Sequence, residues 1–298
     1  MTERIKVKLA VEGQDLEVGT LVTDQARIYF RCSESYLNSD LDISPFKLAK
    51  TRAIQQADTP VFAGLHGVFA DALPDGWGRL LLDRALAEKG VDLSTISPLD
   101  RLAYVGASGM GALTFHPERE ASQVRDNSVD LDRVATAAAN ILSGQASDIL
   151  EKLVEMGGSS GGARPKILVG YNPKTDEILS STEVLPTGFE HWLIKFPAAI
   201  DPEDVANIEY AYHKLALLAG LEMMPCRLFM GKSGRQYFGT KRFDRVGNQR
   251  LHLHSAAGLM HDNFRLSNMD YGHVMDAALR LEESLQGPAK VLRLAAFN

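Results

Sequence analysis

The stretch GGSSGGARPK, at residues 157–166, holds four glycines and two serines and runs straight into the apolar residues 167–169. Glycine adopts backbone angles that other residues avoid, and it lets a ligand approach the main chain closely. Successive exposed amide N–H groups in such a loop can form an anion-binding nest. Glycine- and serine-rich runs are also common in plain surface loops. The elements that follow the run therefore decide between a loop without a ligand and a loop that binds phosphate.

The residues downstream of the run alternate between predicted strands and a predicted helix. Strand patterns cover residues 166–171, about 177–179, 191–197, 227–230 and 236–243, and a helical pattern covers 203–218. In that helix we expect an inward face made of Val205, Ile208, Ala211, Tyr212, Leu215 and Leu218. Two amphipathic helices, at residues 131–142 and 149–154, precede the glycine run.

This order of parts repeats the logic of the ATP-binding lobe of a protein kinase. In such a lobe a glycine loop covers the phosphates, a strand lysine pairs with them, and a helix carboxylate holds the lysine. Lys195, between Ile194 and Phe196, is the candidate lysine, and Glu209 on the next helix is the candidate carboxylate. The alternative interpretation is a lysine that snorkels to the surface and a solvated helix glutamate.

The N-terminal part reads as antiparallel strands over residues 4–33, followed by a loop over 33–42. A helix is predicted after residues 73–76, with Asp75 as its N-cap and Gly90 at its end. Residues 105–111 form a glycine-rich turn into a short strand that ends near Phe115. The polar residues 116–130 form a candidate domain boundary. Helices are predicted at residues 255–261, 270–285 and from 288 onward.

The composition is that of an ordinary globular protein, with 45% hydrophobic and 23% charged residues in a chain of 298. A net charge of −6 argues against a nucleic-acid coat protein or a membrane-surface binder. The N-terminus lacks the apolar core of a signal peptide, and no apolar run is long enough to span a bilayer. The two cysteines, Cys32 and Cys226, are far apart, which predicts free thiols in a reducing cytoplasm.

Two further motifs suggest other chemistry. Gly157-x-Ser159-x-Gly161 matches the pattern of a serine hydrolase, but that motif needs a strand before the serine and a helix after it. Here the predicted order is reversed, and no downstream Asp/His pair is marked by its context. His252 and His254 alternate on a strand-like segment, but a zinc site would need further ligands that the spacing does not supply. We therefore predict no metal site built from protein side chains alone.

Taken together, five segments give the chain its resemblance to the HipA family, the serine/threonine kinase toxins of bacterial type II toxin–antitoxin systems. The segments are residues 73–76, 159–166, 192–197, 207–210 and 242–245. The resemblance implies an α+β, protein-kinase-like fold in three parts. Residues 1–120 would form an N-terminal β-rich subdomain, 121–245 an ATP lobe with an antiparallel sheet, and 246–298 the start of a helical C-terminal lobe.

The resemblance also implies ATP and Mg²⁺ as cofactors and assigns the residues around them. Ser159 corresponds to the serine that family members autophosphorylate, and Ser160 is an adjacent candidate. Glu209 is the candidate acid that holds the phosphate-binding lysine. The implied ATP-binding residues are Ser160, Gly161, Gly162, Lys195, and the adenine connector Lys241, Arg242 and Phe243.

The partners implied by the resemblance are a helix-turn-helix antitoxin of the HipB type, operator DNA reached through it, and a protein substrate such as an aminoacyl-tRNA synthetase. The family's catalytic Asp and Asn would follow Asn298, so we expect no catalytic residue and no phosphate transfer within residues 1–298. The alternative is a module that binds the antitoxin, a nucleotide or both without catalysis. A serine hydrolase that uses Ser159 is a minor alternative.

Overall fold

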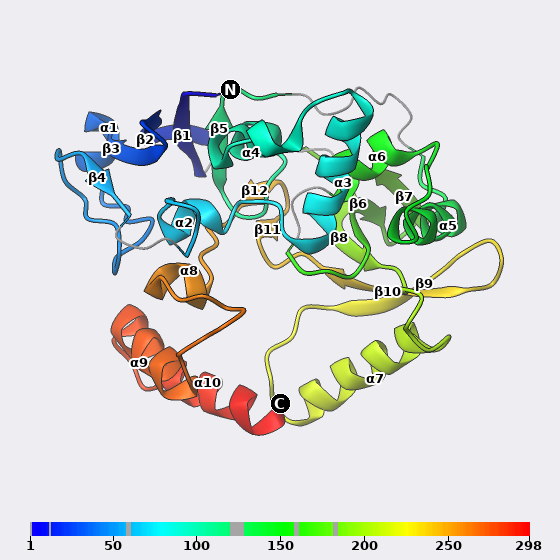
Figure 1. The fold of residues 1–298 in the computed structure, drawn as a ribbon. Helices are drawn as coiled ribbons and strands as arrows, with labels where there is room; N and C mark the ends of the chain where they lie inside the picture. Colours follow the sequence, from blue (N-terminus) through cyan, green and yellow to red (C-terminus); the bar gives the residue numbers. More distant parts are fainter. Residues whose placement is uncertain (1, 12, 58–60, 120–127, 158–160, 181–183) are drawn as a thin grey trace.

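The computed structural model describes residues 2–11, 13–57, 61–119, 128–157, 161–180 and 184–298. Figure 1 shows the two sheets in the upper part of the molecule and the C-terminal helices below them. Each of the two larger sheets has five strands, and their paired strands are antiparallel. The fold combines helices with antiparallel sheets, so the predicted α+β class is confirmed.

The first sheet has the order β4-β3-β2-β1-β5 and comes from the N-terminal part of the chain. Its strands are β1 (Arg4–Val11), β2 (Gln14–Asp24), β3 (Arg27–Cys32), β4 (Gln55–Gln56) and β5 (Leu113–His116). Strict alternation in β1 places Ile5, Val7 and Leu9 in the first hydrophobic core. The predicted strands over residues 4–33 and the short strand near Phe115 are both present.

Three short helices bury residues in the core of this sheet: α1 (Glu34–Leu37), α2 (Gly67–Ala70) and α4 (Pro98–Val105). A 3₁₀ turn covers Leu93–Thr95. The prediction of a plain loop over 33–42 was wrong for the four residues of α1. The hydroxyl of Ser33 accepts a hydrogen bond from the Tyr36 amide, 3.1 Å away, and Tyr36 is buried. An N-cap and one buried ring stabilise a single helical turn that is too short to show a helical period.

The second sheet has the order β7-β6-β8-β10-β9. Its strands are β6 (Lys166–Asn172), β7 (Glu177–Ser180), β8 (Glu190–Lys195), β9 (Cys226–Met230) and β10 (Gln236–Lys241). Helices α5 (Leu131–Leu142) and α6 (Leu150–Gly157) bury their apolar faces in the second hydrophobic core with one face of this sheet. Strand residues Trp192 and Ile194 belong to that core, so Lys195 lies on the opposite face.

Helix α3 (Gly76–Glu88) belongs to the second core, although it precedes the polar stretch that suggests a boundary near residue 120. It contacts α6, and Trp77 packs among the residues of the second core. Asp75 is the N-cap residue, as predicted, but its carboxylate pairs with Arg265 at 2.6 Å instead of capping the helix. The proposed division at residue 120 therefore stays a prediction, and α3 links the two parts.

Helix α7 (Val205–Leu218) lies against β9 and β10. The predicted inward face was wrong: Ala206, His213 and Ala216 are buried, whereas Tyr212 is 61% and Leu218 84% exposed. Ile208 and Leu215 are exposed as well. The helix carries apolar residues around most of its circumference, so periodicity alone did not identify the face that meets the sheet.

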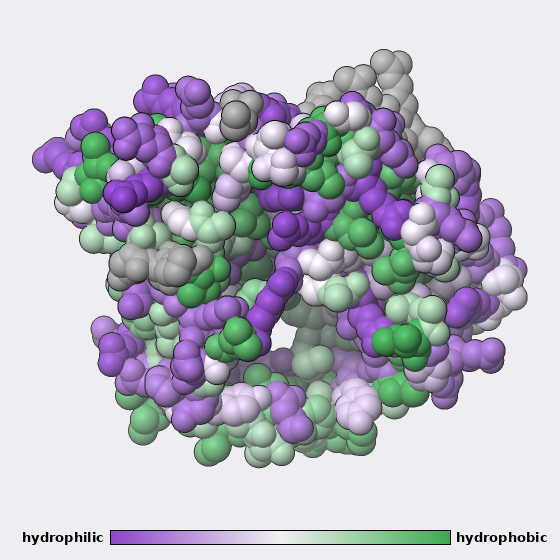
Figure 2. Space-filling model, in the orientation of Figure 1, coloured by the Kyte–Doolittle hydropathy of each residue, from purple (hydrophilic) through white to green (hydrophobic). Residues whose placement is uncertain are grey.

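The C-terminal part begins with a small hairpin, β11 (Arg245–Val246) and β12 (Gln249–Arg250), and continues in α8 (Ala256–Met260), α9 (Tyr271–Glu282) and α10 (Gln286–Phe297). Helices α9 and α10 pack together below the sheets (Figure 1). Figure 2 shows hydrophobic residues along the lower rim of the molecule, where these helices lie. Leu292 and Leu294 are exposed and Phe297 is half-buried. In the described part of the chain, no helix is both long and apolar enough to cross a membrane.

Candidate functional site

The glycine loop connects the end of α6 at Gly157 to the start of β6 at Lys166. Residues 158–160, and with them the candidate serines Ser159 and Ser160, lie outside the described residues. The carbonyl of Gly162 accepts a hydrogen bond from the Trp77 amide at 3.1 Å. A Cβ at Gly76 would lie 2.6 Å from that carbonyl oxygen, so glycine permits the close contact between α3 and the loop.

Lys195 at the end of β8 pairs with Glu209 of α7. The Nζ atom donates a hydrogen bond to Oε2 at 2.7 Å, and both side chains are about one-third exposed. The ammonium also lies 5.4 Å from the centre of the Phe238 ring. The structure thus brings together the lysine and the acid that the order of sequence elements predicts, although nucleotide binding by the pair stays a prediction.

A cavity adjoins this ion pair. Its volume is about 100 Å³, and its lining includes Lys195, Glu209 and the ion pair of Arg164 with Asp201, whose atoms are 2.6 Å apart. That volume equals about three waters at liquid density. The cavity is therefore large enough for a group of a few heavy atoms.

Lys166 is a second lysine at the site, and the sequence interpretation did not include it. It is 5% exposed, and its Nζ donates to the carbonyl oxygens of Gly161 at 2.7 Å and Gly162 at 3.1 Å. Burial and the nearby charge of Lys195 lower the pKa of Lys166 to about 8. The residue ends the glycine stretch, but only the register of β6 against β8 shows that Lys166 lies opposite Lys195.

The three predicted connector residues lie at the end of β10 and just after it. The Lys241 ammonium pairs with Glu190 at 2.7 Å. Arg242 is buried, and its Nε and Nη2 atoms donate to the Asp244 carboxylate at 2.9 and 2.7 Å. Phe243 is 53% exposed. Both cationic side chains are therefore engaged with acids, and the Phe243 ring is the member of the three that stands open to solvent.

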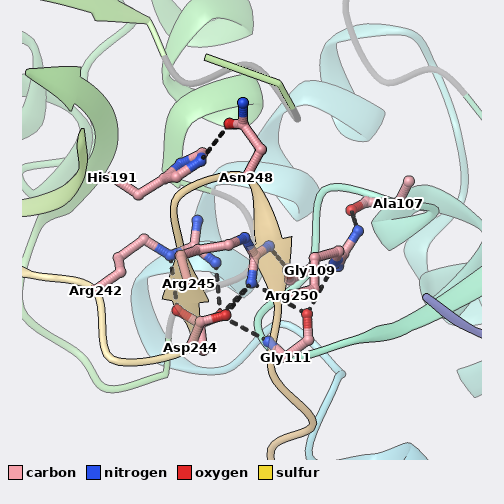
Figure 3. Close-up of polar contacts among 9 residues, drawn as sticks. All are labelled: Ala107, Gly109, Gly111, His191, Arg242, Asp244, Arg245, Asn248 and Arg250. Atoms are coloured by element: carbon pink, nitrogen blue, oxygen red, sulfur yellow. Dashed lines mark hydrogen bonds and ion pairs between the residues drawn. The ribbon is translucent and has the colours of Figure 1, made fainter. Parts of the chain in front are cut away.

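Asp244 is the centre of a buried ionic cluster (Figure 3). Its carboxylate accepts hydrogen bonds from Arg242, from Arg245 at 2.7 Å and from the Gly111 amide at 2.8 Å. Burial alone would raise the pKa of Asp244, but the hydrogen bonds and charges of the two arginines outweigh it and lower the pKa. Burial and the charge of Arg242 in turn lower the pKa of Arg245 to about 9.

The same cluster attaches the connector to the glycine-rich turn before β5. Arg250 donates to the carbonyl oxygens of Ala107 at 2.6 Å and Gly111 at 2.9 Å (Figure 3). His191 lies beside the cluster, where burial and the charge of Arg242 lower its pKa to about 4. The glycine-rich turn at residues 105–111 thus contributes backbone carbonyls that accept hydrogen bonds from Arg245 and Arg250.

Two family models match the sequence: the HipA N-terminal domain over residues 9–116 and the HipA-like C-terminal domain over residues 158–298. The chain belongs to the HipA family. The fold is also similar to a chain in the solved complex of the Shewanella oneidensis MR-1 toxin–antitoxin system, which holds HipA, HipB and operator DNA. That likeness has a TM-score of 0.64 at 18% identity and covers 99% of this chain and 68% of the Shewanella chain. Among curated proteins, none matches the sequence significantly.

In this HipA-family chain, the hydrolase alternative lacks the local geometry that it needs. Helix α6 precedes the glycine loop and strand β6 follows it, which is the reverse of a nucleophile elbow. A Ser–His–Asp chain does occur elsewhere: the His254 ring lies 3.0 Å from the Ser44 hydroxyl and 2.7 Å from the Asp71 carboxylate. Ser44 is only 1% exposed, so a substrate has no access to this hydroxyl.

The histidines near the C-terminal part instead connect two segments of the HipA-family fold. His252 hydrogen-bonds to the Ile43 carbonyl at 2.9 Å, and the Gly67 amide donates to the His261 ring at 3.0 Å. Together with His254, these contacts join residues 252–261 to the N-terminal part. Among the residues that the structure describes, no group of three or more His, Cys, Asp or Glu side chains could hold a metal ion.

Proposed function

We propose that this chain carries the ATP-binding lobe of a HipA-like serine/threonine protein kinase toxin and that it binds ATP between the glycine loop, β8 and α7. The observation that carries the proposal is the ion pair between Lys195 and Glu209 next to the loop. In protein kinases such a pair places the lysine where it can contact the nucleotide phosphates. The proposed site would take ATP with Mg²⁺, and Gly161, Gly162 and the exposed Phe243 ring would border the nucleotide.

Replacement of Lys195 tests this proposal. Lys195→Met removes the ammonium and keeps a similar side-chain length, so we expect ATP to bind at least about tenfold more weakly in isothermal titration calorimetry. The matched control is Lys232→Met, because Lys232 lies on the hairpin of the same sheet and pairs with Asp130. Equal ATP affinities for wild type and Lys195→Met would rule out the assigned site.

The chain as it stands would bind nucleotide without transferring phosphate. After the connector, no Asp in residues 245–298 is followed five positions later by an Asn, the spacing of a kinase catalytic loop. We expect no label from radioactive ATP-Mg²⁺ to enter the purified chain or an added protein such as an aminoacyl-tRNA synthetase. Incorporation that Lys195→Met abolishes would contradict this, and mapping of the label to Ser159 or Ser160 would then identify autophosphorylation.

The partner proposal rests on the solved Shewanella complex, whose HipA is bound with HipB and operator DNA. We propose a helix-turn-helix antitoxin of the HipB type as the partner of this chain, and operator DNA through that antitoxin. The two unpaired cysteines, Cys32 and Cys226, agree with a cytoplasmic setting. Co-elution of the chain with a purified HipB-like protein in gel filtration tests the proposal, and separate elution would contradict it.

A further inference from the structure

Two lysines lie side by side on neighbouring strands at the candidate site. Lys166 of β6 and Lys195 of β8 are directly opposite in the antiparallel register, and like charges in that arrangement destabilise a sheet. Glu209 neutralises Lys195. In the described ranges, no carboxylate lies within ion-pair distance of Lys166, whose hydrogen bonds go to two backbone carbonyls. Lys166 is therefore a buried ammonium whose charge is not paired with a carboxylate of the described residues.

The position of those carbonyls determines where the loop amides point. A planar trans peptide directs its C=O and its N–H in opposite directions. The Gly161 carbonyl shares a peptide with the Gly162 amide, and the Gly162 carbonyl shares one with the Ala163 amide. Because both carbonyls turn toward the Lys166 ammonium, these two N–H groups point away from it. Successive amides that are free of other partners can form an anion-binding nest.

We propose that Lys166 is a positioning residue of the nucleotide site, which holds the carbonyls of Gly161 and Gly162 so that the loop presents its amides to phosphate. The inference rests on the proposed ATP-binding function. Lys166 acts through the loop, and Lys195 is the lysine that would meet the nucleotide directly.

Loss of the Lys166 charge has an expected pH dependence. Burial and Lys195 lower the pKa of Lys166 to about 8, while the charges of Asp75 and Glu209, which also face it, act in the opposite direction. The ammonium is therefore lost as the pH rises from 7 to 9, and a neutral amine holds carbonyls less strongly. If only the charged form orders the loop, the dissociation constant for ATP should rise about tenfold over this range.

The test combines calorimetry with hydrogen exchange on the full chain. Wild type, Lys166→Met, Lys166→Gln and the control Lys232→Met are titrated with ATP at pH 7, 8 and 9. Lys166→Met should bind ATP about tenfold more weakly at pH 7, with little further change up to pH 9. Lys166→Gln keeps donors without the charge, so it should retain part of the affinity but lose the pH dependence. Without nucleotide, amides of residues 161–164 should exchange faster in Lys166→Met than in wild type or the control.

The outcomes separate the two proposals. Unchanged exchange of the loop amides in Lys166→Met, with the same unfolding midpoint as wild type, would overturn the anchoring role whether or not ATP binds. Failure of wild-type protein to bind ATP at any pH would overturn the proposed function and the nucleotide role of Lys166 together. An ATP affinity in Lys166→Met that equals wild type and falls equally with pH would overturn the positioning role alone.

Discussion

Asp244 carries a charge in the interior because two guanidinium groups surround it. Its side chain is 1% exposed, and it contacts Arg242, Arg245 and the amide of Gly111. Two buried cations share one carboxylate, and the carbonyl of Gly111 takes up a further N–H of Arg245 at 3.2 Å. Deleting one member of a buried ionic cluster leaves the others charged without compensation, which costs more than the cluster itself contributes.

We therefore expect Asp244→Ala to lower the free energy of unfolding by about 3–5 kcal/mol. Chemical denaturation monitored by circular dichroism measures this change. Asp276→Ala is the control, since Asp276 pairs with Arg280 at 2.9 Å on the exposed surface of α9, where such pairs contribute little. Equal losses in the two variants would show that the buried cluster does not stabilise the fold in this way.

At the scale of elements, α2 and α8 meet through a glycine on each helix. A Cβ at Gly67 of α2 would lie 1.9 Å from the carbonyl oxygen of Gly258 in α8, and a Cβ at Gly258 would lie 2.5 Å from the Asp71 carboxylate. Asp71 in turn accepts hydrogen bonds from the amide and hydroxyl of Ser255, at 2.6 and 2.7 Å. This contact positions α8 against the N-terminal part, and therefore the segment that leads to α9.

Gly67→Ala should push the two helices apart, because the new methyl group would meet backbone atoms that cannot move independently. Overpacking of this kind costs about 1–3 kcal/mol of unfolding free energy. Hydrogen exchange should also increase in residues 251–261, which carry the histidine contacts. Gly161→Ala is the control for stability, since a Cβ there meets nothing within 4 Å. Exchange rates that stay at the wild-type level would show that the contact between α2 and α8 does not hold residues 251–261 in place.

At the scale of the whole molecule, apolar side chains are exposed on helices α7 and α10. Helix α7 leaves Tyr212, Leu215 and Leu218 exposed, and α10 leaves Leu292 and Leu294 exposed. Helix α10 also reaches the segment that follows α7, where Arg293 donates to the Gly220 carbonyl at 3.2 Å. Exposed apolar residues therefore occur on both helices, and a contiguous apolar surface is typical of a protein that associates.

We expect the purified chain to self-associate as its concentration rises, which sedimentation velocity would detect as an increase in weight-average mass. Leu215→Lys should reduce the association without loss of thermal stability, because the side chain is already 52% exposed. Val246→Lys is the matched control, an exposed apolar residue on β11. A monomer at all concentrations, or an equal effect of both substitutions, would contradict association through these helices.

The elements themselves could be predicted from sequence because helical and strand periods are short-range properties of the chain. Alternation over residues 4–33 predicted β1, β2 and β3 of the first sheet, and the strand–helix order around Lys195 and Glu209 predicted two residues that do form an ion pair. Five quoted segments were enough to suggest the HipA family, which two family models then showed. The same dependence on local periods limited the prediction of short elements. The single turn of α1 contains too few residues to display a helical period.

Sequence by itself thus determined the order of the elements around the glycine loop, the α+β class and the family. Only the tertiary structure decided which face of α7 is buried. Apolar side chains surround that helix, and packing against the sheet buries Ala206 and Ala216. Strand register places Lys166 opposite Lys195. The packing of the connector against the glycine-rich turn places Asp244 next to the amide of Gly111, 133 residues away in sequence. Such pairings depend on contacts between distant segments, and a local pattern carries no information about which distant segment will supply the partner.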